Sequence, residues 1–174
     1  MRVHIFTLTA VCAIVTLSAA PGAAQGRSAA PKGQEIAAQA KAAKLDRANV
    51  GLGTFQGQRM ALTPADLSHL KSVDDLKAGQ VVGLLENGAA GDETGLPPGK
   101  YDLYLAEVGG QWRAYAEAGG QIVKEAVRAD VQPAAQAQAS TKPQFQPAGW
   151  CFYAPWPVWS GGTLYWYIIG PICF

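Results

Sequence analysis

The middle of the chain alternates between apolar and polar residues in a pattern that predicts an antiparallel β-sheet. Four runs are rich in β-forming residues: 80–86, 100–108, 111–118 and 121–131. Gly109-Gly110 and Gly119-Gly120 separate the last three runs, and two-residue hairpin turns favour glycine because they need positive φ angles. We therefore predict a mainly β fold with short helices (α+β), built on an antiparallel β-meander with two Gly-Gly hairpins.

These turns also fix which residues share a face of the predicted sheet. In this register Tyr104 lies opposite Tyr115, and Ala118 lies opposite Gln121. One face collects Tyr101, Leu103, Leu105, Trp112, Ala114, Ala116, Val123 and Val127. The other face collects Asp102, Tyr104, Arg113, Tyr115, Glu117, Lys124 and Arg128. We expect the first face to line the core and the second to meet solvent. Glu125 falls on the apolar face, so we expect either a bulge or fraying of the strand near it.

Residues 150–174 hold nine of the chain's sixteen aromatic residues and no charged residue. Ser160-Gly161-Gly162 predicts a hairpin turn, and Pro155 and Pro157 predict that the strand before it lies at a sheet edge. Such a segment either completes the core or contacts a partner, and composition leaves both open. The candidate contact residues are Trp150, Phe152, Tyr153, Trp156, Trp159, Tyr165, Trp166 and Tyr167, with Tyr104 and Tyr115 as secondary candidates.

Cys151 and Cys173 flank this aromatic segment, and they are the only cysteines after residue 24. Cysteines of exported proteins normally pair, because the compartments outside the cytosol are oxidising. A bridge between them closes a loop of about two dozen residues, which stabilises a fold by about 3 kcal/mol in the chain-entropy account. We therefore predict a Cys151–Cys173 disulfide that staples the C-terminal hairpin.

Residues 1–24 have the composition of a secretory signal peptide. Arg2 gives a short basic start, residues 5–20 are apolar, and Gly22 and Ala24 are small residues suited to cleavage. A retained membrane anchor is the alternative, for which the apolar run is short. Removing Arg2 lowers the count of Lys and Arg from 14 to 13, which equals the count of Asp and Glu. This neutral chain has no electrostatic reason to bind nucleic acid. We expect an exported protein, periplasmic or extracellular, and association with the outer membrane is a further alternative.

Composition divides the remaining chain into four zones: a flexible or helical stalk rich in Ala, Lys and Gln (25–50), a small α+β domain with the meander (51–131), a Pro/Ala/Gln linker (132–149) and the aromatic disulfide hairpin (150–174). Only Ile36 and Leu45 are large apolar residues that would hold a helix of the stalk on a core. Thr63-Pro64 and Ser72-Val-Asp-Asp75 both have the pattern of a helix start.

The chain offers few groups for catalysis or metal binding. His69 is the only histidine after residue 24, so neither a His/Cys metal cage nor a Cys/His nucleophile pair is expected. Asp92 and Glu93 lie in a loop without EF-hand spacing, and the Gly-rich stretches lack P-loop and dinucleotide-binding spacings. We expect no metal, no cofactor and no catalysis; an enzyme acting outside the cell is the least favoured alternative.

The stretch from Leu96 to Leu105, LPPGKYDLYL, resembles the Pro-Gly-x-Tyr-x-Leu start of a strand in many exported β-sandwich modules. The resemblance covers ten residues and implies a strand without implying a function. We predict an exported, non-enzymatic envelope or secreted protein, whose β scaffold presents the aromatic C-terminal segment to a protein, a glycan or a second copy. The alternative is an outer-membrane-associated protein that docks through the same segment.

Overall fold

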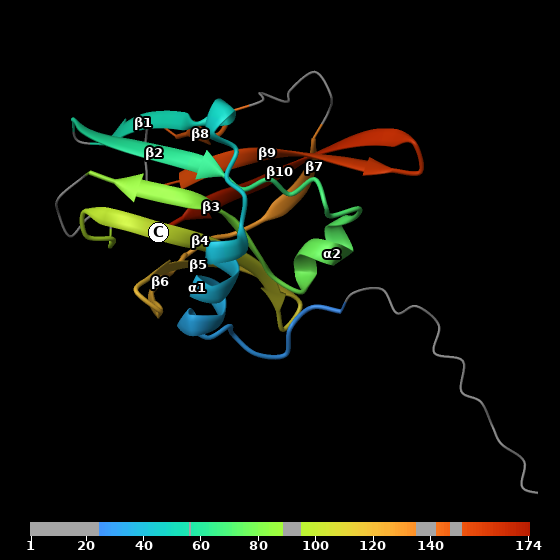
Figure 1. Ribbon diagram of the computed structural model, residues 1–174, viewed down its shortest axis with the longest axis horizontal. Coiled ribbons are helices and arrows are strands. Elements are labelled where there is room, and N and C mark those ends of the chain that lie inside the picture. Colours follow the sequence, from blue (N-terminus) through green and yellow to red (C-terminus); the bar gives the residue numbers. More distant parts are fainter. Residues whose placement is uncertain (1–24, 56, 89–94, 135–141, 147–150) are drawn as a thin grey trace, which may run out of the picture.

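The computed structural model describes residues 25–55, 57–88, 95–134, 142–146 and 151–174, and it is mainly β with few short helices, as predicted (Figure 1). A six-stranded antiparallel sheet has the order β1-β2-β3-β4-β5-β6, and a four-stranded antiparallel sheet has the order β7-β10-β9-β8. The first sheet comprises β1 (Gly51–Phe55), β2 (Gln58–Pro64), β3 (Gln80–Asn87), β4 (Gly99–Val108), β5 (Gln111–Ala118) and β6 (Gln121–Glu125). The second comprises β7 (Val131–Ala134), β8 (Gln144–Phe145), β9 (Cys151–Ser160) and β10 (Thr163–Cys173). The predicted signal peptide, Trp150, Asp92 and Glu93 lie outside the described residues.

The Gly-Gly turns form the predicted hairpins. Tyr104 pairs with Tyr115 as expected, and the glycines at both turns have positive φ. The second hairpin starts in the predicted register and then shifts by one residue between Ala116 and Glu117, which confirms the predicted bulge. The core assignment of Val123 and Val127 is wrong, since 43% and 79% of these residues is exposed. The bulge places Lys124 opposite Ala116 instead of Val123, and β6 ends before residue 127.

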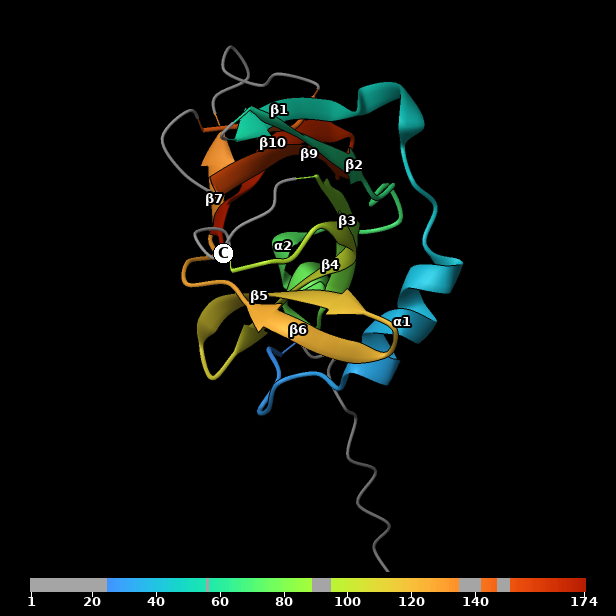
Figure 2. The same cartoon turned by 90° about the vertical axis from the view of Figure 1, so that its left-hand side faces the viewer.

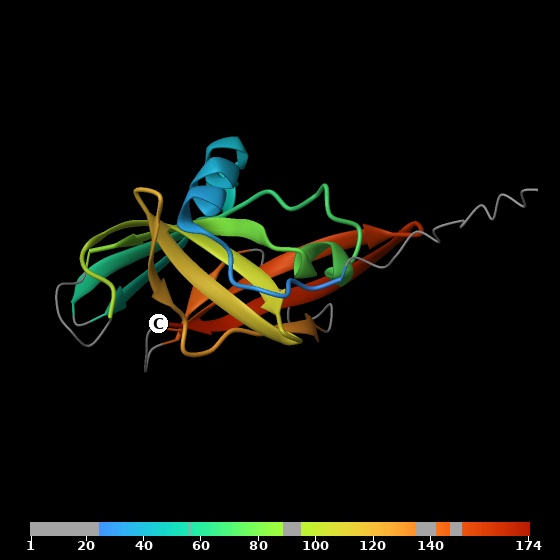
Figure 3. The ribbon, with the colours of Figure 1, turned by 90° about the horizontal axis from the view of Figure 1, so that it is seen from below.

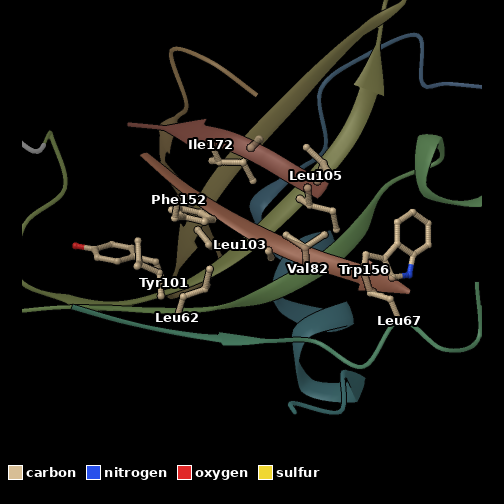
Figure 4. Close-up of a cluster of buried hydrophobic side chains, with 14 of the residues drawn as sticks. Leu62, Leu67, Val82, Tyr101, Leu103, Leu105, Phe152, Trp156 and Ile172 are labelled. Carbon is tan, nitrogen blue, oxygen red and sulfur yellow. The ribbon is translucent and has the colours of Figure 1, made fainter. Parts of the chain in front are cut away.

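The hydrophobic core lies between the meander and the inward face of the β9–β10 hairpin (Figures 2 and 4). Leu103 and Leu105 of the meander pack in one cluster with Phe152, Trp156 and Ile172 of the hairpin. The inward face of the C-terminal segment therefore completes the core, which was one of the two alternatives for this segment. The hairpin shares its core with the meander because the meander's apolar face needs a second layer to exclude water.

Part of the predicted linker belongs to this second sheet. Val131–Ala134 pairs with β10, and Gln144–Phe145 pairs with β9. The expectation of an unpaired linker is therefore wrong for residues 132–134 and 144–145; residues 135–141 and 147–149 lie outside the described residues. The segment lacks apolar alternation, and its composition therefore indicated a linker. Backbone hydrogen bonds to a neighbouring strand form without apolar alternation, because every residue except proline carries an N–H and a C=O group.

Helix α1 (Gly33–Ala42) covers the other face of the meander, opposite the hairpin (Figure 3). Ile36 is fully buried against Val81, Tyr104 and Tyr115, so a single large apolar residue anchors the helix. The helical alternative for the stalk is confirmed, and it is packed on the sheet. The solvent-facing assignment of Tyr104, Tyr115 and Glu117 is wrong, because these residues are only 1–2% exposed.

The helix start at Ser72 is confirmed, whereas the one at Thr63-Pro64 is wrong. The Ser72 side chain accepts a hydrogen bond from the Asp75 N–H, and the Asp75 carboxylate accepts one from the Ser72 N–H, at the start of α2 (Val73–Lys77). Thr63 and Pro64 end strand β2, in which alternate residues Met60 and Leu62 are buried. The segment forms a strand because β3 pairs with it from Met60 to Pro64, which includes the predicted helix start.

Candidate functional site

The disulfide joins the two strands of the C-terminal hairpin. Cys151 and Cys173 are directly opposite in the β9–β10 register and are bonded, as predicted. The bond fits an exported protein in an oxidising compartment. Within the described residues no helix is long and apolar enough to cross a membrane, and no group of His, Cys, Asp and Glu side chains is arranged to hold a metal ion.

The strand register separates the hairpin into an inward and an outward face. Directly opposed residues of antiparallel strands point to the same side of the sheet. Val158 and Trp156 are buried, so their partners Tyr165 and Tyr167 belong to the inward face. The outward face carries Tyr153, Pro155, Pro157, Trp159, Leu164, Trp166 and Ile168, all of them uncharged.

The structure divides the predicted contact aromatics into buried and accessible residues. A role as an exposed contact residue is wrong for Phe152 and Trp156, which are 2% and 3% exposed in the core because they share a face with Val158. Tyr167 is partly buried, with its ring centroid 5.7 Å from that of Trp156. The Tyr153 hydroxyl accepts a 2.6 Å hydrogen bond from the Gln146 side chain.

Trp159 and Tyr165 are the most accessible of these aromatics, at 61% and 49% exposure, and Trp166 is half-buried. All three belong to the hairpin tip, residues 157–166, which extends past α2 (Figures 1 and 3). Trp159 lies on the outward face of the tip and Tyr165 on the inward face, beyond the edge of the core. The tip therefore presents aromatic side chains on both of its faces.

A cavity of about 270 Å³ lies between β9 and the segment that connects β2 to α2. Three tryptophans of the hairpin contribute to its wall: Trp156, Trp159 and Trp166. Polar side chains on the opposite wall come from Asp46, Asn49, Asp66 and Ser68. The cavity thus combines aromatic rings with a few fixed oxygen and nitrogen atoms, which is the usual composition of a small-molecule site.

Local backbone bonds hold the polar wall in place. An antiparallel bridge between Leu45 and Ala65 makes Asp46 and Asp66 diagonal neighbours. The Asp46 N–H donates to the Pro64 carbonyl at 2.8 Å, and the Asp66 N–H donates to the Lys44 carbonyl at 2.7 Å. The Asp46 carboxylate accepts hydrogen bonds from the side chain of Asn49 and the backbone of the short 3₁₀ helix Arg47–Asn49.

Asp66 is fixed by its neighbours as a charged acceptor. Hydrogen bonds from the Ser68 hydroxyl and N–H hold the pKa of Asp66 below its ordinary value, and Lys44, at 3.3 Å, adds to the effect. The Lys44 side chain is 83% exposed, so its charge remains in solvent at the rim. Asp66 is therefore ionised at neutral pH, with its oxygens directed by two local donors.

Trp156 lines the cavity and carries an unused hydrogen-bond donor. Its indole nitrogen is buried and has no acceptor among the described residues. In Figure 4 the indole lies at one end of the core cluster beside Leu67, and both residues line the cavity. Buried donors are nearly always satisfied, so this one calls for an explanation.

Tyr104 and Tyr115, the secondary candidates, are covered by α1 and its preceding segment. Arg27 donates two hydrogen bonds to the Glu35 carboxylate and a third, at 3.1 Å, to the Tyr104 hydroxyl. Burial raises the pKa of both phenols. A contact role is therefore wrong for this pair, which faces α1 as a buried cross-strand pair. His69 is exposed at the edge of a second cavity, between α1 and the 65–69 segment.

Replacing Asp102 with Asn is expected to stabilise the protein at pH 7. Burial, together with repulsion from Glu117 directly opposite, raises the pKa of Asp102. A carboxyl group whose pKa is raised by folding destabilises the folded state as pH rises from the unfolded pKa through the folded one. The urea midpoint of the variant should exceed that of the native chain at pH 7, and the gap should shrink as pH falls toward about 3.9. Equal midpoints at pH 7 would contradict this.

Sequence reasoning found the tryptophans of the cavity and missed its polar wall. Asp46 and Asp66 are twenty positions apart and neither belongs to a recognisable motif. The alternation of Met60 and Leu62 could have revealed strand β2 and hence the chain reversal that brings the 64–66 segment against residues 44–46. Comparison of the chain with protein-family models, curated proteins and solved structures finds no match.

Proposed function

We propose that this chain is an exported, non-enzymatic binding protein, periplasmic or extracellular, whose β scaffold presents the tip of its C-terminal hairpin to a partner. The observation that carries the proposal is the exposure of Trp159 and Tyr165 on an uncharged hairpin whose base is fixed in the core. Tryptophan and tyrosine provide large contact areas with few rotatable bonds, and they dominate the binding energy of many interfaces.

The edge of β9 favours contact through side chains over strand addition. Residues 154–160 of β9 have no partner strand on the side away from β10 among the described residues. Pro155 and Pro157 lie in this stretch and have no N–H group to donate. An added strand would therefore find an interrupted row of donors, while the tryptophan rings remain accessible.

Docking on a membrane surface is the second candidate function. Tryptophan and tyrosine favour the membrane–water interface, because their rings are apolar and each carries one polar atom. The projecting tip, with Trp159 and Tyr165 on opposite faces, has this composition and no charge.

Replacing both Trp159 and Tyr165 by alanine is expected to weaken binding to the envelope fraction, to vesicles or to a second copy about tenfold or more. Large aromatic anchors of this kind each contribute more than about 1.4 kcal/mol to the binding free energy. Binding of the purified protein to washed envelope fractions and to phospholipid vesicles is measured by co-sedimentation, and self-association by analytical ultracentrifugation. Leu52→Ala is the matched control, since Leu52 is 78% exposed but lies in β1. A monomer that binds neither fraction, or a double variant that binds as well as the control, would contradict the proposal.

A further inference from the structure

The cavity beside β9 has the size of a site for one ring of a larger ligand. Its volume of about 270 Å³ is just below the range of about 300–1,000 Å³ that is typical of small-molecule sites. A dinucleotide or a haem needs more space than this. A single six-membered ring fits, and its neighbours along a chain would extend over the exposed Trp159.

Trp159 and Trp166 form an aromatic platform on the outward face of the hairpin. Trp166 is opposite Pro157, and Trp159 is opposite Leu164, so the two tryptophans are diagonal neighbours on one side of the sheet. Diagonal neighbours in a sheet are about 7–8 Å apart, which is within reach of aromatic side chains. The face of an indole carries partial negative charge and attracts polarised C–H groups. Sugar rings present such C–H groups on one face and hydroxyl groups around the edge.

The polar wall complements the edge of a sugar ring. Asp46 and Asp66 offer carboxylate oxygens that accept hydrogen bonds from hydroxyl groups; Asn49, which gives one amide N–H to Asp46, has a second to donate, and the Ser68 hydroxyl, which donates to Asp66, can still accept. Two carboxylates also repel anions, no Lys or Arg is among the described residues that line the cavity, and Lys44 is paired with Asp66 at the rim. This charge pattern excludes sulfated and uronic-acid ligands.

The unsatisfied N–H of Trp156 provides an independent indication of a ligand. Trp156 is only 3% exposed and lines the cavity. Its indole N–H has no protein acceptor among the described residues. Since the nitrogen is shielded from solvent, a ligand oxygen reaches it only when a neighbour such as Leu67 shifts. A hydroxyl oxygen then supplies the acceptor that the core lacks.

We infer that this cavity binds one ring of a neutral saccharide, which stacks on Trp159 and Trp166 and donates hydroxyl hydrogen bonds to Asp46 and Asp66. The inference rests on the proposed binding function and names its ligand class. It also assigns different tasks to the two exposed aromatics of the tip, because Tyr165 does not line the cavity.

The test is a titration of the purified, disulfide-bonded protein, followed by tryptophan fluorescence and calorimetry. The neutral probes are cellohexaose, maltohexaose, laminarihexaose and chitohexaose, and the charged probes are oligogalacturonate and tetramethylammonium. At least one neutral probe should bind, Trp166→Ala and Trp159→Ala should each weaken it about tenfold, and Tyr165→Ala should leave it unchanged. Trp156→Phe, which keeps an aromatic ring and removes the N–H, should weaken it about fivefold.

Three results would overturn the inference: no neutral probe binds, a charged probe binds better than every neutral one, or Trp166→Ala binds as well as the native protein. Thermal melts of each variant identify any loss of fold, and Asp66→Asn gives a second variant that keeps all three tryptophans. If envelope or vesicle binding is lost in the Trp159/Tyr165 double variant while no saccharide binds, the proposed function stands and only the saccharide assignment fails.

Discussion

Deleting residues 151–174 is expected to abolish cooperative folding of the remaining chain. The deletion removes seven residues of the buried core: Phe152, Ala154, Trp156, Val158, Ile169, Ile172 and Phe174. Six of the seven have large apolar side chains, and burial of one such side chain stabilises a protein by about 1.5–3 kcal/mol, so the loss is about 9–18 kcal/mol. That is comparable with the whole stability of a typical domain, about 5–15 kcal/mol. The apolar face of the meander would also become exposed to water.

Far-UV and near-UV circular dichroism during a thermal melt measure this effect. The truncated chain should show no sigmoidal transition and should bind a hydrophobic dye already at low temperature. The Trp159/Tyr165 double alanine variant is the control, because it changes the same hairpin only at exposed positions and should melt like the native protein. A cooperative melt of the truncated chain would show that the meander and α1 fold without the second sheet.

Replacing both Cys151 and Cys173 with alanine is expected to lower the free energy of unfolding by about 3 kcal/mol. The disulfide spans 22 positions of the sequence, so it restricts a sizeable loop in the unfolded chain. It also holds the open end of the hairpin, where Phe152 and Ile172 enter the core. For a chain of 174 residues, this change corresponds to a drop in melting temperature of roughly 10 °C.

Urea unfolding of the native protein, the reduced native protein and the double alanine variant gives the comparison. The reduced protein and the variant should have similar midpoints, both well below that of the oxidised protein. Thiol labelling of the denatured, unreduced protein should leave Cys151 and Cys173 unlabelled. A loss below about 1 kcal/mol would mean that the packing of the hairpin already restricts its ends without the bond.

Much of the meander could be predicted from local sequence. The Gly-Gly turns set the register at which Tyr104 meets Tyr115, because a two-residue turn leaves no freedom in the pairing of the flanking residues. The same reasoning found the C-terminal hairpin, in which Thr163 pairs with Ser160 around Gly161 and Gly162. The disulfide followed from the presence of only two cysteines after residue 24.

Burial could not be predicted in the same way. Tyr104 and Tyr115 have charged neighbours along their strands, and that pattern indicates a solvated face. Helix α1 covers them because one residue, Ile36, fits between them and Val81. Whether a weakly amphipathic helix docks depends on the shape of the surface it meets, and that shape is formed by residues distant in sequence.

The sequence by itself determined the strand register, the hairpins and the disulfide, since each depends on residues that are close together or on a unique pairing. Only the tertiary structure decided which aromatics of the C-terminal segment are buried. In the folded protein Phe152 and Trp156 point into the core, whereas Trp159 and Tyr165 remain accessible. It also brought Asp46 and Asp66 to the cavity beside the tryptophans. The physical reason is that alternation along a strand distinguishes two faces, but only packing against other elements decides which face is covered and how far along the strand the cover extends.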